Sequence, residues 1–331
     1  MVYAKGINGG MNILRCRKIN KHLDFCSLMQ KIIPHLWFDK EAKEASSLYI
    51  SLFKNSKIKT VTTIAGTPSG DCDVITFEIA GKECMAISAG PYFKLNPSIS
   101  FFVEFTGEKE IDSVWAALVK NAKVLMPYNS YPWANKYGWL EDAFGVSWQL
   151  CWSENDGVGD QFHQKITPLL MFTNRVAGKT KEAIEWYTSI FPNSKIDVVV
   201  PYTKEDGEKE GFVKHSKFTL SGQNFMAMDS SHPHAFNFNE ALSFVVLCAT
   251  QEEIDYYWKK LSAVPIAEQC GWLKDKYGVS WQIVPTVLSE MLTNGDKEKI
   301  VRVTKAFLTM KKFNIELLKK AYVGEKLFRT E

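Results

Sequence analysis

The chain has 331 residues, of which 46% are hydrophobic and 23% are charged, a composition typical of a soluble globular protein that is long enough for two domains. The longest uncharged apolar run, at residues 242–249, is too short to cross a bilayer, so the sequence predicts no membrane partner. The net charge of +3 divides into +4 in residues 1–28, +4 in residues 285–331 and −5 in the body between them, so the body lacks the basic surface of a nucleic-acid-binding protein.

Residues 1–28 precede the first predicted strand and form an N-terminal extension that we expect to be poorly ordered. Basic residues interrupt its apolar stretches, so a secretory signal is not indicated. The chain has seven cysteines, an odd number, and none has C-x-x-C spacing, which argues against a disulfide framework and a structural zinc site. We therefore expect a protein of the reducing cytoplasm.

The next 120 or so residues read as two modules, each with one strand, one helix and three further strands. The elements expected in the first module are a strand at 31–38, a helix from Ala42 to Phe53, a strand opening at Lys57, and strands at 74–79 and 84–88 joined by a tight turn at Gly81. Those expected in the second module are a strand at 99–105, a helix with Ile111, Val114, Trp115 and Leu118 on one face, and strands at 124–128, 137–142 and 147–152.

The same pattern then returns, so residues 30–152 and 164–284 are two copies of one α+β domain. The sequence GWLEDAFGVSWQL at 138–150 matches GWLKDKYGVSWQI at 271–283 in nine of thirteen positions. In the second copy the link before Gly271 is about ten residues shorter and lacks the stretch with Tyr131 and Trp133. The predicted division is an extension at 1–28, a first domain at 29–153, a linker at 154–163, a second domain at 164–284 and a helical appendage at 285–331.

Three repeated motifs resemble one family: the opening K-I-x-P-x-L-x-F, the N-S-K-I after the first helix, and the closing G-W-L-x-D-x-x-G-V-S-W-Q. They are similar to the PhnB-like (3-demethylubiquinone-9 3-methyltransferase-like) group of the vicinal oxygen chelate superfamily, which includes glyoxalases, bleomycin-resistance proteins and dioxygenases. The resemblance implies tandem domains, each with two βαβββ modules forming an eight-stranded cup around a ligand or metal. It also implies an internal pseudo-dimer of the two copies, and leaves open whether two chains pair as a homodimer.

Metal-dependent members of the superfamily take His and Glu ligands from four strand positions, and this chain departs from that pattern. The matching positions hold Ile32 and Ile166, Met85–Ser88 and Met226–Asp229, Ser100 and Ser243, and Gln149 and Gln282. Because no copy supplies more than one carboxylate at these positions, we expect neither a metal ion nor another cofactor. Asp229 is the one residue that leaves the metal-dependent alternative open.

Strand alternation indicates which side chains face the cup. Gln149 shares a face with Ser147 and Cys151, whereas Trp148 and Leu150 face the helices. The glutamines and the matching serines either satisfy groups within the sheet or orient a ligand, and the aromatic candidates either line a pocket or pack in the core. The candidate ligand-binding residues are Phe38, Ser88, Ser100, Trp139, Gln149, Phe172, Asp229, Ser243, Trp272 and Gln282.

Other catalytic patterns are weak or missing in the sequence. His232 and His234 have no nearby Cys or Glu partner in sequence, and His35 is expected in the core or at its boundary. No Gly-rich S-adenosylmethionine loop, P-loop, dinucleotide fingerprint or G-x-S-x-G motif is present, so no catalytic residue is assigned.

The sequence therefore favours a metal-independent protein that binds a small apolar or aromatic molecule. One alternative is a metal-dependent lyase, isomerase or dioxygenase of the glyoxalase type. Another is that one copy is purely structural and serves as a built-in dimer partner. Whether the chain is an enzyme is not decided by the sequence.

Overall fold

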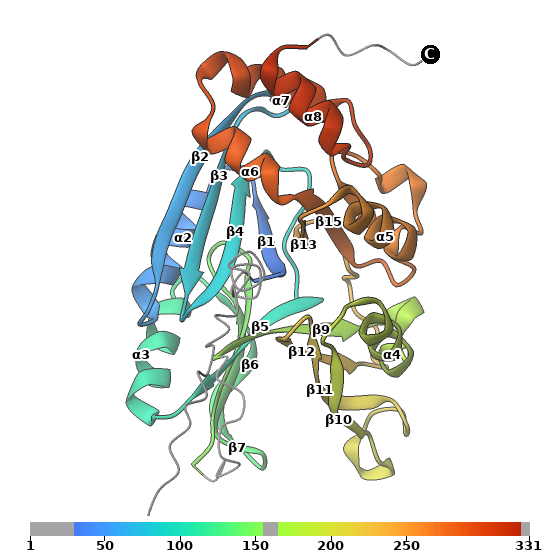
Figure 1. Cartoon of the computed structure of the whole chain (residues 1–331). Coiled ribbons are helices and arrows are strands. Elements are labelled where there is room, and N and C mark those ends of the chain that lie inside the picture. The colour runs from blue at the N-terminus through green and yellow to red at the C-terminus, as the bar shows by residue number, and fades with distance from the viewer. Residues whose placement is uncertain (1–29, 155–164, 326–331) are drawn as a thin grey trace, which may run out of the picture. The chain divides into compact units, whose positions relative to one another are not determined.

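The computed structural model describes residues 30–154 and 165–325 (Figure 1). The predictions for the extension at 1–28 and for linker residues 155–163 lie outside the described residues. Within the part that is described, no helix is long and apolar enough to pass through a membrane.

The first sequence copy forms the two expected modules. Its elements are β1 (Ile32–Phe38), α2 (Ala42–Leu52), β2 (Lys57–Thr67), β3 (Gly70–Ile79), β4 (Lys82–Ser88), β5 (Ile99–Phe105), α3 (Glu108–Leu118), β6 (Lys123–Tyr131), β7 (Ala134–Glu141) and β8 (Ser147–Trp152).

The second copy repeats this order with one strand fewer and then continues into three helices. Its elements are β9 (Ile166–Phe172), η1 (Asn174–Val176), α4 (Thr180–Ile190), β10 (Lys195–Pro201), η2 (Lys204–Asp206), β11 (Val213–Leu220), β12 (Gln223–Asp229), β13 (Leu242–Cys248), α5 (Gln251–Leu261), η3 (Pro265–Ala267), β14 (Trp272–Lys274) and β15 (Ser280–Pro285), followed by α6 (Thr286–Asn294), α7 (Lys297–Leu308) and α8 (Ile315–Val323).

The strands form two mixed sheets, and each sheet combines modules from both copies. Sheet A has the order β14-β15-β13-β1-β4-β3-β2, and sheet B has the order β10-β11-β12-β9-β5-β8-β7-β6. The joins are antiparallel pairs, β1 with β13 in sheet A and β5 with β9 in sheet B. The predicted fold class, with two modules of this kind in each sheet, is confirmed, and the structure adds that the two modules of a sheet come from different copies.

Sequence periodicity gives no indication of this exchange between copies. The two copies carry nearly the same strands, so β13 can offer β1 the edge that β5 of the same copy would offer. Alternation fixes which face of a strand is buried, but it does not specify the neighbouring strand.

Sheet A has seven strands rather than eight because the short link before Gly271 leaves no room for a counterpart of β6. The segment after α7 takes up part of that edge. The Cys270 N–H donates to the Met310 carbonyl at 2.8 Å, and the Gly271 N–H donates to the Lys311 carbonyl at 2.7 Å. A Cβ on Gly271 would lie 2.4 Å from the ring of Phe313, so this close approach requires glycine. The helical appendage is therefore part of the edge of sheet A.

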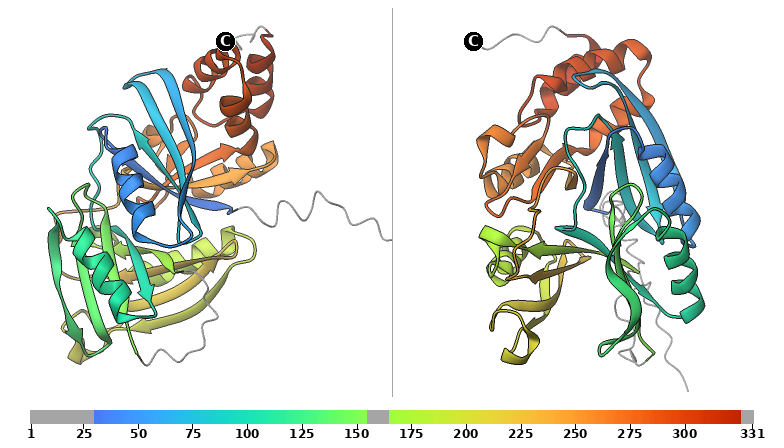
Figure 2. Two further views of the ribbon diagram at one scale, coloured as in Figure 1. Left: turned by 90° about the vertical axis from the view of Figure 1, so that its left-hand side faces the viewer. Right: turned by 180° about the vertical axis from the view of Figure 1, so that it is seen from behind.

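The appendage also contacts the other end of the sheet order. Helix α6 continues directly from β15, and α7 contacts β2, the strand at the opposite edge of sheet A. Figures 1 and 2 show α6, α7 and α8 gathered near the end of the β2–β3 hairpin.

The repeated G-W-L-x-D-x-x-G-V-S-W-Q motif forms a buried clamp between modules. The Asp142 carboxylate accepts hydrogen bonds from the Tyr49 hydroxyl on α2 at 2.8 Å and from the Trp148 indole on β8 at 2.9 Å. It also accepts from two backbone N–H groups of the turn that follows it. Because α2 packs on β3 and β4 of sheet A while β8 lies in sheet B, the clamp ties the two sheets together.

The second copy repeats the clamp in full. Asp275 accepts from the Tyr187 hydroxyl at 2.7 Å and from the Trp281 indole at 2.9 Å. Burial raises the pKa of Asp142 and of Asp275, and the hydrogen bonds to each carboxylate oppose that shift. These hydrogen bonds, which hold the fold together, explain why this stretch is the most similar part of the two copies.

Candidate functional site

Each sheet has one face packed against helices and a second face, which we call the inner face. In β1 the side chains of Ile32, Leu36 and Phe38 belong to the hydrophobic core beneath the helices. The alternate residues therefore lie on the inner face. By the strand register, the inner face of sheet A carries Ile33, His35, Trp37, Met85, Ile87, Ser243, Val245, Trp272, Ser280 and Gln282.

The inner face of sheet B holds a chain of paired polar groups. The Tyr137 hydroxyl donates to Gln149 Oε1 at 2.8 Å, and Gln149 Nε2 donates to Ser100 Oγ at 2.8 Å. Next to it, the Trp139 indole donates to Ser147 Oγ at 2.8 Å. Tyr137, Gln149, Ser100 and Ser147 are all buried, so these hydrogen bonds satisfy groups that have little access to water.

The inner face of sheet A keeps only part of this arrangement. Gln282 Nε2 donates to Ser243 Oγ at 3.0 Å, as in the other sheet. Cys270 stands where the first copy has Tyr137, so no tyrosine hydroxyl is supplied to Gln282 at that position. Among the described residues, the buried Ser280 hydroxyl has no hydrogen-bond partner.

His35 adds a second unpaired group to the inner face of sheet A. It lies opposite Ser243 on one neighbouring strand and Met85 on the other, and it is 4% exposed. Its Nδ1 has no hydrogen-bond partner in the described part of the chain. Burial lowers the pKa of His35 to about 4, so the imidazole is neutral at physiological pH.

Aromatic rings surround this histidine. The His35 and Trp272 rings meet edge to face with centroids 5.8 Å apart, and the Trp37 and Trp272 rings do so at 6.1 Å. Trp37 also meets Phe93 at 5.1 Å, and its indole donates to the Gly90 carbonyl. Trp272 thus contacts His35 and Trp37, whereas the matching Trp139 of sheet B bonds a serine.

The structure places six of the sequence candidates on the inner faces, three in each sheet. They are Ser100, Trp139 and Gln149 in sheet B, and Ser243, Trp272 and Gln282 in sheet A. The two serines lie opposite residues of the other copy, because Ser243 faces His35 of β1 and Ser100 faces Leu169 of β9.

Phe38 and Phe172 do not lie on an inner face. Both share the strand face that packs beneath the helices, and both belong to the hydrophobic core. Phe172 meets the rings of Phe238 and Tyr277 there. Ser88 is also engaged elsewhere, because its hydroxyl accepts from the Ala42 N–H at the start of α2 at 3.2 Å.

Asp229 is the candidate that left the metal-dependent alternative open. In the structure its carboxylate anchors the backbone instead. One carboxylate oxygen accepts from the Gly178 N–H and the Thr180 hydroxyl, both at 2.7 Å, and the other accepts from the Val213 N–H at 2.9 Å. Asp229 lies opposite Phe172, on the helix side of sheet B. Burial raises its pKa, while these hydrogen bonds oppose the shift.

The other metal-like features do not converge. His234 bonds the Ser230 hydroxyl at 2.9 Å, and His232 lies 3.5 Å from a carboxylate oxygen of Glu208. In residues 30–154 and 165–325, no three His, Cys, Asp or Glu side chains are grouped so that they could hold a metal ion.

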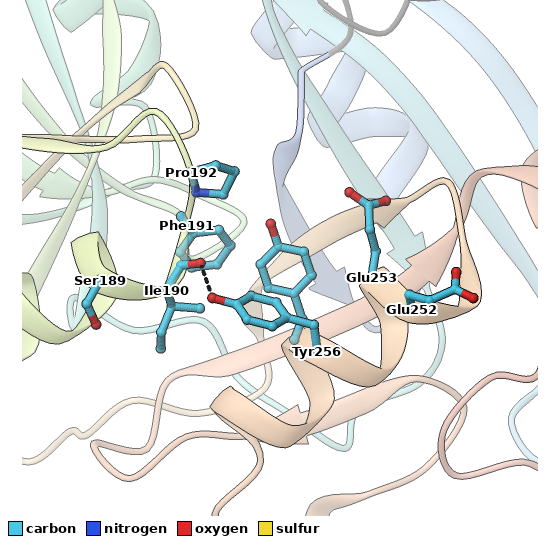
Figure 3. Close-up of a pocket in the computed structure, with 8 residues that line it drawn as sticks. Ser189, Ile190, Phe191, Pro192, Glu252, Glu253 and Tyr256 are labelled. Atoms are coloured by element: carbon cyan, nitrogen blue, oxygen red, sulfur yellow. Dashed lines mark hydrogen bonds between the residues drawn. The ribbon is translucent and has the colours of Figure 1, made fainter.

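A surface depression of about 500 Å³ lies away from the inner-face residues, between the end of α4 and the first turns of α5 (Figure 3). The Tyr256 hydroxyl spans it by donating to the Ile190 carbonyl at 2.8 Å. Glu252 and Glu253 line its α5 side, and Glu253 pairs with Lys31 at 2.8 Å. None of the residues predicted from the sequence lines this depression.

Sequence reasoning missed His35 and Ser280. Alternation alone places His35 with Ile33 and Trp37, and a comparison of the copies shows Leu169 at the matching position. The unpaired state of Ser280 has no sequence signal, because the second copy keeps both the serine and the tryptophan that pair in the first copy.

Comparison with known proteins fits this architecture. The family model described as 3-demethylubiquinone-9 3-methyltransferase matches residues 30–151 and, a second time, residues 164–284. The chain belongs to this family. The double match confirms that the family's domain occurs twice in tandem, as the repeated motifs indicate.

Several solved structures are similar to the chain. The PhnB protein of Bacillus cereus is 36% identical over 38% of this chain and 100% of its own, with a TM-score of 0.36. Glyoxalase I from Zea mays is 8% identical over 76% of this chain and 92% of its own, with a TM-score of 0.45. The fosfomycin resistance protein FosX from Listeria monocytogenes is 11% identical over 35% of this chain and 88% of its own, with a TM-score of 0.28. A search among curated proteins finds no match.

Proposed function

We propose that this family member binds a small aromatic molecule on the inner face of sheet A, without a metal ion. The observation that carries the proposal is a pair of buried polar atoms, His35 Nδ1 and Ser280 Oγ, that lack partners among the described residues. A buried polar group without a hydrogen bond costs roughly 1–3 kcal/mol. A ligand that bonds to these atoms would offset that cost.

The surroundings of these atoms suggest the ligand's chemistry. Trp37 and Trp272 are only partly buried, and aromatic faces and edges favour other rings. A neutral imidazole has one nitrogen that donates and one that accepts, and a serine hydroxyl can do both. The best fit is a ring that bears a small uncharged polar group, such as a hydroxyl or an amide.

Sheet B takes the structural role in this proposal. Its matching polar groups already bond to one another through Tyr137, Gln149 and Ser100, and through Trp139 and Ser147. A ligand would have to break these hydrogen bonds before it could use them. The expectation that one copy serves as a built-in partner therefore becomes a proposal about one sheet.

The metal-dependent alternative loses its main support with Asp229, whose two oxygens bond the backbone and a hydroxyl on the helix side of sheet B. His35 and Gln282 remain on the inner face of sheet A, but one imidazole and one amide are a poor ligand set for a divalent cation. These residues support binding without a metal.

The test is binding of hydroxylated phenols and indoles, measured by thermal shift and calorimetry, with Zn²⁺ and Mn²⁺ alone in parallel. The informative variants are Ser280→Ala and His35→Leu, and the matched control is Ser147→Ala in sheet B. We expect one or more aromatic compounds to bind, with at least about tenfold weaker binding in each sheet A variant and less than threefold change in the control. Stabilisation by the metal ions alone, or loss of binding only in the control, would contradict the proposal.

A further inference from the structure

Three aromatic side chains cluster at the tip of the β6–β7 hairpin. Tyr131 ends β6, Trp133 lies in the turn, and Tyr137 follows on β7. The Tyr131 and Trp133 rings are stacked, with centroids 5.0 Å apart and planes 25° apart. Both rings meet Tyr137 edge to face, at 5.7 Å and 6.2 Å.

Trp133 is exposed even though its ring is held in place. It is 58% exposed, which is unusual for the largest apolar side chain in a folded protein. Tyr131 is fixed by a hydrogen bond from its hydroxyl to the Pro127 carbonyl at 2.9 Å. Tyr137 is fixed by its bond to Gln149. A ring that is already immobilised loses little freedom when it binds a second ring, so this surface is preorganised for stacking.

The fold does not require this cluster. The second copy lacks the hairpin tip and has Cys270 at the position of Tyr137, and its edge is instead covered by residues 310 and 311. Two copies of one domain therefore fold with and without the three rings, so an exposed tryptophan here is not a packing necessity.

The charges beside the cluster are already paired. Lys136, the neighbour of Tyr137, bonds Asp112 at 2.6 Å and Glu108 at 2.8 Å. The Tyr128 hydroxyl also donates to Asp112. This leaves the faces of the Trp133 and Tyr131 rings as the main recognition element, with no cation or anion of this triad free to select a charged ligand.

We propose that the Tyr131–Trp133 pair is a stacking platform for the planar aromatic ring of a small neutral molecule. The ring lies on the exposed face of Trp133 and extends the existing stack. Electron-rich indole and phenol rings favour an electron-poor partner, so a heteroaromatic ring with carbonyl or imine groups is the preferred class. This site is separate from the inner face of sheet A and does not depend on the function proposed there.

The test uses the full chain with lumichrome, a neutral planar heteroaromatic molecule, and with 1-adamantanol, which is apolar but not planar. Binding is measured by calorimetry and by quenching of tryptophan fluorescence. The variants are Trp133→Ala, Trp133→Phe, Tyr92→Ala as a second exposed aromatic residue outside the cluster, and His35→Leu for the sheet A site. Circular dichroism checks that each variant is folded.

We expect lumichrome to bind at least about tenfold more weakly to Trp133→Ala, because stacking on one aromatic side chain commonly changes affinity by about five-fold to a hundredfold. Trp133→Phe should retain binding within about threefold, and Tyr92→Ala and His35→Leu should match the wild type. The proposal is overturned if lumichrome does not bind, if 1-adamantanol binds equally well, or if Trp133→Ala binds as the wild type does. Loss of lumichrome binding in His35→Leu alone would show that the lumichrome ring binds at sheet A, and this result would also overturn the proposal.

Discussion

The inner faces of sheets A and B carry several of the same repeated residues, but their polar groups are paired differently. Each has a serine–glutamine pair at its centre, Ser243 with Gln282 and Ser100 with Gln149. In sheet B a tyrosine and a tryptophan complete the pairing of the polar groups, whereas in sheet A Ser280 and His35 each have an atom with no partner among the residues that the structure describes. A duplication can therefore keep one arrangement as scaffold while the other becomes available for a ligand.

The Asp142 and Asp275 clamps show the opposite behaviour, because both copies keep every contact. Each carboxylate accepts from one tyrosine, one tryptophan and two backbone N–H groups. The clamp residues that hold the sheets together are the same in both copies, whereas the hydrogen bonds of the inner faces differ between them.

The largest expected effect concerns pH and His35. Its pKa is about 4 in the folded chain because of burial, against 6.5 for an unperturbed histidine. Between these values the unfolded chain binds the proton and the folded chain does not, so stability falls as pH drops from about 6.5 to about 4. This contribution amounts to roughly 3 kcal/mol and should vanish in His35→Leu.

The measurement is the free energy of unfolding of both proteins at pH 7 and at pH 4.5. His215 of sheet B, whose pKa burial also lowers to about 4, is present in both proteins and cancels in the difference. An identical loss of stability in wild type and His35→Leu would show that His35 is not the buried neutral group described.

The next effect compares the two central glutamines. Gln149→Leu leaves both the Tyr137 hydroxyl and Ser100 without a partner, so it should cost roughly 2 kcal/mol or more. Gln282→Leu leaves only Ser243 and should cost roughly 1 kcal/mol. Urea unfolding of the two variants measures the difference, and equal costs would mean that the two networks are equivalent after all.

The smallest effect comes from the matched serines. Ser147→Ala removes the acceptor of the Trp139 indole and should destabilise the chain by roughly 1 kcal/mol. Ser280→Ala removes a buried hydroxyl that has no partner in residues 30–154 and 165–325, and it should be neutral or slightly stabilising. Thermal unfolding of the two variants measures the difference in stability. A larger loss of stability for Ser280→Ala than for Ser147→Ala would mean that the Ser280 hydroxyl is hydrogen-bonded.

The repeat, the module order, the helical appendage and the facing of β8 follow from sequence because they depend on local periodicity. Trp148 and Leu150 lie in the core and Gln149 on the inner face, as alternation predicts. The exchange of modules does not follow, because two similar strand edges compete for each partner. Phe38 and Phe172, for which the sequence left a pocket role and a core role open, belong to the core.

The remaining differences depend on three-dimensional contacts. Asp229 resembles a ligand in sequence, yet the backbone N–H groups of Gly178 and Val213 reach it from segments distant along the chain. Ser280 resembles Ser147, yet its tryptophan turns toward a histidine contributed by the other copy. Neither fact can be derived from one strand and its pattern.

The most direct test of the central claim is a crystal structure of the chain with the tightest-binding hydroxylated aromatic compound. The account predicts density for the ring against Trp37 or Trp272, with a polar group of the compound within hydrogen-bond distance of His35 or Ser280, and an unchanged Tyr137–Gln149–Ser100 chain in sheet B. A compound seated in sheet B with that chain broken, or a cation held by three protein side chains in either sheet, would contradict it.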